Sequence, residues 1–104
     1  MKLTIIPADK AVYKDGLCYS ELSLSGIPSD VHALQWNNTK GLIEFCEDSD
    51  GNKPANEPII ELPDWADAAL AVWEAAKIAE EAAIAAAKEL AAQNQPVSQG
   101  TQDL

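Results

Sequence analysis

Hydrophobic and polar residues alternate over short distances in the first sixty positions of the chain, which is typical of β-strands. Residues 3–6 form an apolar run that Pro7 closes, and this run predicts a first strand. Residues 11–13 and 17–19 flank an Asp-Gly pair at positions 15 and 16. We expect a hairpin here, because the glycine of such a pair accepts the positive φ that a tight turn needs.

A second hairpin is predicted further along. Residues 31–36 and 42–46 are its two strands, and the five residues between them are rich in turn formers. The polar stretch 47–58 carries two prolines and a glycine, so we expect a loop. Residues 59–62 predict one last short strand.

After Pro63 the hydrophobic period changes from two residues to that of a helix. Residues 64–92 contain no glycine and no proline, and fourteen of them are alanine, the best helix former. Asp64 and Asp67 stand in the first turn, where carboxylates suit the positive end of the helix dipole. At 1.5 Å per residue such a helix is about 40 Å long. A domain of some sixty residues is narrower than that, so we expect part of the helix to project or to lie against a partner.

These elements predict an α+β protein, in which a small antiparallel β-rich N-terminal domain with two hairpins precedes one long alanine-rich C-terminal helix. The β domain covers residues 1–62, the helix residues 63–92, and a polar tail residues 93–104. A β domain of this size is close to the limit at which a lone core is marginal. We therefore expect it to be supported by the helix, by an oligomer or by another protein.

One face of the predicted helix carries the spacing of a coiled coil. Spacings of four and three residues alternate without a miss through eight positions, namely Trp65, Ala69, Val72, Ala76, Ala79, Ala83, Ala86 and Leu90. We predict that these eight residues, the heptad stripe, form a partner interface. The alternative is that alanine, which also occupies the other faces, produces the stripe by composition alone. A second stripe through Leu70 and Trp73 stops at Lys77, and we assign it to the β domain.

The charge of the chain narrows the classes of partner. Seventeen acidic residues face seven lysines and no arginine, and the formal net charge is −10. Because the lysines do not cluster, the sequence lacks the cationic patch that nucleic acids and anionic membranes require. No stretch reaches the roughly twenty apolar residues that span a bilayer, and the opening residues are too short an apolar run for a signal peptide.

Candidates for chemistry are few. His32 is the single histidine, and its neighbours on the same face of the predicted strand, Leu34 and Trp36, are apolar. Residues 47–52 resemble a calcium-binding loop, but the glycine is misplaced and the closing glutamate is missing. We therefore expect a protein that is not an enzyme and that holds neither a metal nor a cofactor.

The cysteines and tryptophans are interpreted as structural residues. Cys18 and Cys46 predict two free, mostly buried thiols, since no secretory context favours a disulfide. Trp36 and Trp73 are predicted as core anchors, because indoles bury large areas. Trp65 is assigned to either the core or the interface.

Several strings together carry a family resemblance. They are IIP at 5–7, VYKDG at 12–16, IP at 27–28, VHALQW at 31–36, IEF at 43–45 and LPDWA at 62–66, followed by Ala69 and Trp73. In this order they resemble a family of small proteins of tailed bacteriophages, encoded beside tail-fibre genes and described as tail-fibre assembly or accessory proteins. The resemblance covers roughly residues 1–75. No single string is specific, and the alanine-rich stretch that follows gains no support from the family.

The resemblance implies a chaperone or accessory subunit that binds a trimeric tail-fibre protein in the host cytoplasm and then leaves or stays in the virion tail. It implies no catalytic residue. Fibre trimers expose unpaired strand edges until their chains register, and such edges aggregate. A β domain and a projecting helix could cover them. Two alternatives stay open: a self-associating structural virion protein with a homo-oligomeric coiled coil, and an acidic DNA-mimic inhibitor.

Overall fold

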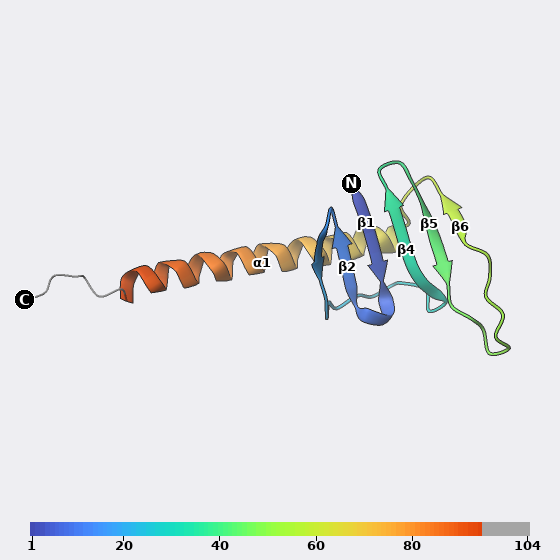
Figure 1. Ribbon diagram of the computed structural model, residues 1–104, viewed down its shortest axis with the longest axis horizontal. Helices are drawn as coiled ribbons and strands as arrows, with labels where there is room; N and C mark the ends of the chain where they lie inside the picture. The colour runs from blue at the N-terminus through green and yellow to red at the C-terminus, as the bar shows by residue number, and fades with distance from the viewer. Residues whose placement is uncertain (95–104) are drawn as a thin grey trace, which may run out of the picture.

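The protein consists of a six-stranded antiparallel sheet followed by one long helix, in a computed structural model that describes residues 1–94 (Figure 1). This confirms the predicted α+β class. The strand order is β3-β2-β1-β4-β5-β6, and every neighbouring pair is antiparallel. The elements are β1 Lys2–Ile6, the 3₁₀ turn η1 Pro7–Asp9, β2 Ala11–Lys14, β3 Leu17–Tyr19, β4 Val31–Asn37, β5 Lys40–Phe45, β6 Glu57–Ile59 and α1 Asp64–Asn94.

Both predicted hairpins form around residues that accept a left-handed backbone. Strands β2 and β3 are joined through Asp15 and Gly16, whose φ values are 50° and 89°. Strands β4 and β5 are joined through a shorter connection than predicted, because Asn37 already pairs with Lys40. Asn38, with φ 62°, supplies the turn there, since asparagine tolerates this region better than most residues.

Strand β6 lies earlier in the chain than predicted. It spans Glu57–Ile59 and pairs only with β5, with Pro58 opposite Leu42. We expected a loop up to residue 58 because residues 47–58 are polar and carry two prolines and a glycine. An edge strand tolerates proline, since one side of its backbone has no strand to pair with, and this is the position that β6 occupies.

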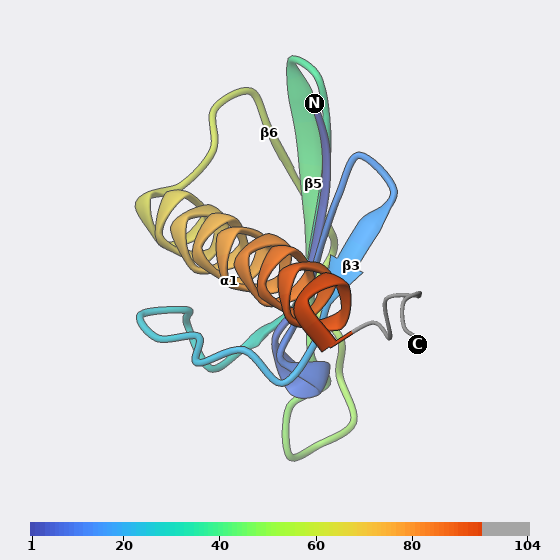
Figure 2. The same cartoon turned by 90° about the vertical axis from the view of Figure 1, so that its left-hand side faces the viewer.

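One face of the sheet and the first turns of α1 enclose the core. Buried residues come from four strands and from Ala66, Ala69 and Trp73 of the helix. Figure 2, in which α1 points toward the viewer, shows the helix on one side of the sheet. Trp36 and Trp73 are 9% and 3% exposed, as expected of core anchors, whereas Trp65 is half-buried and packs against the rim of the core.

A β-bulge in β4 changes the predicted faces. The register with β5 shifts between Val31 and Ala33, because a bulge places two residues of one strand opposite one of its partner. Leu34 and Trp36 keep their place in the core, but His32 is exposed. The expectation that His32 shares their face is therefore wrong.

The cysteines are free but not buried as expected. Cys18 is half-buried and Cys46 is exposed. Cys18 pairs with Tyr13 on the face of the sheet that turns away from the helix, and Cys46 follows the last residue of β5. Both thiols therefore lie outside the apolar layer between the sheet and α1.

Candidate partner interface

The β2–β3 hairpin is where α1 leaves the sheet, and Trp73 is the centre of the contact. The indole Nε1 donates a hydrogen bond of 3.0 Å to the backbone oxygen of Leu17. The ring of Tyr19 meets the indole edge-on, with centroids 5.8 Å apart. The ammonium of Lys14 lies 5.0 Å from the indole centroid, a distance at which a cation is attracted by the ring. The hairpin thus fixes the helix at this residue.

Charged groups directly after Trp73 and about two turns beyond it form the last contacts between sheet and helix. The Tyr19 hydroxyl donates a hydrogen bond of 2.7 Å to Oε1 of Glu80. This bond, with burial and the negative charges of Glu80 and Glu81, raises the pKa of Tyr19 to about 12. Nζ of Lys14 lies 3.7 Å from Oε2 of Glu74. Beyond Glu80 every residue of α1 up to Ala92 is exposed.

The free part of the helix is held by its own interactions at its start. Lys77 donates a 2.8 Å hydrogen bond to Glu81 one turn later. That bond, ahead of other causes, raises the pKa of Lys77. A pair at this spacing adds a few tenths of a kcal/mol to a helix. The remaining support is the intrinsic preference of alanine for the helix.

The free part also exposes large apolar side chains. Ile78, Ile84 and Leu90 are 66%, 49% and 58% exposed. They are spread around the helix among small alanines, and Glu81, Lys88 and Glu89 stand between them. Figure 1 shows this part of α1 extending past β3, away from the β domain. With 31 residues, α1 is about 46 Å long at 1.5 Å per residue.

The structure divides the predicted heptad stripe into two parts. Ala69 is buried in the core, while Trp65, Val72 and Ala76 are half-buried beside the sheet. Its other members are exposed, namely Ala79, Ala83, Ala86 and Leu90. Beyond Glu80 the helix has left the sheet and every residue up to Ala92 is exposed, so the last members of the stripe have no part of the β domain to contact. Assigning Ala69 to a partner interface was therefore wrong, because the β domain already covers it.

A second exposed stripe on α1 was missed from the sequence. It has the same alternation of three and four residues and is exposed at every position, at Ala68, Ala71, Ala75, Ile78, Ala82 and Ala85. The spacing alone could have identified it. What the sequence did not provide was the rotation of the helix on the sheet, which decides which alanine stripe stays uncovered.

Two other kinds of site, a metal cluster and a membrane-spanning helix, are absent from the described part of the chain. Among residues 1–94, no three side chains of His, Cys, Asp or Glu come together in a way that could hold a metal ion. In the same range, no helix combines the length and the apolar character needed to cross a bilayer.

Comparisons with known proteins give no relative. No protein-family model matches the chain, and neither the curated proteins nor the solved structures contain a match.

Proposed function

We propose that this protein is a non-enzymatic accessory or assembly factor of a bacteriophage tail fibre, and that it binds the fibre protein through the exposed part of α1 with the β domain as its platform. The observation that carries the proposal is a helix that continues beyond its last contact with the sheet at Glu80 and presents Ile84 and Leu90 to solvent.

Energetics favour a partner for this segment. Residues 81–92 continue a helix that its docked half already nucleates, but none of them is buried against the β domain, so tertiary packing adds nothing to their stability. Fully burying one large apolar side chain gains about 1.5–3 kcal/mol. Covering any of Ile78, Ile84 and Leu90, which lie on different sides of the helix, would thus stabilise both the helix and the complex.

The resemblance selects the kind of partner. The strings that resemble tail-fibre assembly proteins lie in β1, β2, β4, β5, the connection before β4 and the first turns of α1. They build the β domain and the docking of the helix onto it, not the exposed end. In this proposal the β domain is the common platform, and the free end of α1 adapts each protein to its own trimeric fibre.

The proposal is tested by co-expression with the product of the neighbouring gene, which the proposal expects to be a tail-fibre protein. We expect the protein to co-purify with the fibre and to increase the yield of soluble trimer. The triple variant I78S/I84S/L90S should lose both effects. Tyr13→Ser is the matched control, because Tyr13 is 40% exposed but lies in β2 of the β domain, and it should act like the parent. Equal activity of the triple variant would exclude the helix as the binding surface, and no effect of the parent protein would exclude the function.

Self-association is a second candidate, favoured by the exposed alanines of the heptad stripe. Alanines let two helices approach to the short end of the usual 8–10 Å range. Ala79, Ala83 and Ala86 are free to meet the same residues of a second copy. Sedimentation equilibrium separates the two functions, since a protein that stays monomeric at the highest soluble concentration cannot be a homo-oligomeric coiled coil.

A further inference from the structure

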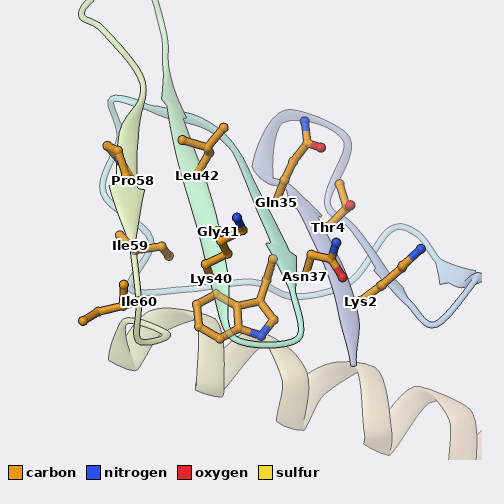
Figure 3. Close-up of a pocket in the computed structure, with 11 residues that line it drawn as sticks. Lys2, Thr4, Gln35, Asn37, Lys40, Gly41, Leu42, Pro58, Ile59 and Ile60 are labelled. Carbon is orange, nitrogen blue, oxygen red and sulfur yellow. The ribbon is translucent and has the colours of Figure 1, made fainter.

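The face of the sheet that turns away from α1 carries a groove lined by four strands. Its volume is about 630 Å³, within the range of sites that hold small ligands and peptide side chains. Figure 3 shows that the labelled side chains come from β1, β4, β5 and β6 and the residue after it.

One row of paired residues gives this groove a polar end. Asn37 of β4 pairs with Lys2 on one side and with Lys40 on the other. The three side chains therefore form one row across three strands, with an amide between two ammonium groups. Within residues 1–94 neither lysine forms a salt bridge, and no acidic residue lines the groove. In a chain with a formal net charge of −10, this is a local positive site.

The neighbouring row is apolar at one end. Gln35 pairs with Thr4 and with Leu42, and Leu42 pairs with Pro58 of β6. Leu42 is 41% exposed and Ile60 is 80% exposed, so these two side chains offer apolar surface to an occupant. Glu44, the nearest acid on β5, is bound by the Gln35 amide at 2.7 Å. This hydrogen bond partly neutralises the negative charge of Glu44, so the carboxylate repels an anion in the groove less strongly.

The part of β4 and β5 that lies between the two rows is held in place by close packing. Gly41 lies opposite Trp36, and a side chain at position 41 would collide with the backbone oxygen of Gln35 and with the Trp36 ring. Trp36 is held in the core on the other side. The two rows therefore keep their spacing, which is two residues along the strands, or about 6.6 Å.

We propose that this groove binds an extended protein segment that carries a carboxylate and a large apolar side chain two residues apart. In an extended chain, residues i and i+2 point the same way and are separated by the same 6.6 Å or so, which matches the spacing of the rows. The carboxylate lies between Lys2 and Lys40 and accepts from the Asn37 amide. The apolar side chain covers Leu42, Pro58 and Ile60.

A nucleic acid fits this surface less well than a peptide. A nucleic acid carries many negative charges and is repelled by the net negative charge of the whole protein. Two lysines would release only a few counterions from its phosphates. A single carboxylate responds to the local pair of ammonium groups. The proposal concerns the face opposite α1, so it depends neither on the helix nor on a fibre as partner.

The test is an NMR titration of the full-length protein with the synthetic peptide acetyl-Thr-Glu-Thr-Leu-Thr-amide. We expect saturable shifts of the amides of residues 2–4, 35–37 and 40–42 and no shifts in α1 beyond residue 80. Replacing the glutamate of the peptide by glutamine or lysine, or its leucine by serine, should weaken binding. Shifts scattered over the protein, or equal binding of the lysine peptide, would overturn the proposal.

Substitutions in the protein complete the test. Lys2→Gln and Lys40→Gln should each weaken peptide binding by about two- to fivefold, the effect of one exposed ion pair, and Leu42→Ser should weaken it as well. Lys53→Gln is the matched control, because Lys53 is exposed in the loop before β6, and it should bind like the parent. All four positions are exposed, so dispersed spectra are expected throughout. Unchanged affinity of the double variant K2Q/K40Q, or displacement of the peptide by an oligothymidylate, would exclude a carboxylate site.

Discussion

The two halves of α1 are similar in alanine content, but the first half is packed against the sheet and the second half is exposed. The first half places Ala66, Ala69 and Trp73 against the sheet, whereas in the second half all residues from Glu81 to Ala92 are exposed. Alanine is common in both. The difference teaches that alanine does not decide where this helix docks. One indole with three kinds of contact fixes the position, and buried alanines only allow the helix to approach.

The largest expected difference in stability between the halves is produced by removing one large side chain from each. Trp73→Ala removes a buried indole together with its hydrogen bond to Leu17, and such a change costs about 3–5 kcal/mol. Ile84→Ala removes an exposed side chain from the free half, and we expect a change within about 0.5 kcal/mol. Urea unfolding followed by circular dichroism measures both values. If both variants lost the same stability, the free half would have to be packed in solution.

A smaller difference is expected when one alanine from each half is enlarged. Ala69 is 3% exposed under the sheet, so Ala69→Leu overpacks the contact and costs about 1–3 kcal/mol. Ala83 lies on the same heptad stripe but is exposed, and Ala83→Leu should leave the stability of the isolated protein nearly unchanged. The midpoint of thermal unfolding compares the two variants directly. A tolerant position 69 would contradict the assignment of this part of the stripe to the core.

Many features of the two halves could be predicted from sequence patterns, whereas the others depend on how the elements pack in the folded protein. Asp15-Gly16, the turn formers at 37–41 and Pro63 mark the ends of elements along the chain, so both hairpins and the start of α1 could be predicted. The bulge beside His32 could not, because one extra residue in a strand leaves no distinct pattern. The division of the heptad stripe depends on how α1 is rotated on the sheet, which Trp73 decides through contacts with residues some fifty positions away.

The open face of the sheet illustrates the same limit. The lysines of the groove are 38 positions apart in the chain, at 2 and 40, and only the register of β1 with β4 and of β4 with β5 brings them into one row. From the sequence alone the lysines are scattered, and we predicted that none cluster. The antiparallel pairing produces a small cluster that linear spacing does not contain.

The smallest expected effect on stability comes from the hydrogen bond at the boundary between the two halves, which the Tyr19 hydroxyl donates to Glu80. The pKa of Tyr19 is raised to about 12, above the value near 10 of an unfolded chain. A raised pKa means that the contribution to stability is complete below pH 10 and is lost as the pH rises from 10 to 12. Because the pair lies at the surface, solvent screening keeps the contribution small.

The variant Tyr19→Phe isolates this effect. Its stability relative to the parent should be lower below pH 10 and should approach the parent value toward pH 12, since ionised Tyr19 no longer donates. Absorbance at 295 nm follows the ionisation itself, and the late-titrating tyrosine should disappear in Tyr19→Phe. Tyr13, the other tyrosine of the chain, is the control. A hydrogen bond with Cys18, and not a residue of α1, is the main cause that raises its pKa, so Tyr13→Phe should retain the titration near pH 12. If the latest-titrating tyrosine survived in Tyr19→Phe, the hairpin would not hold α1 at Glu80, and the free half would begin nearer to Trp73.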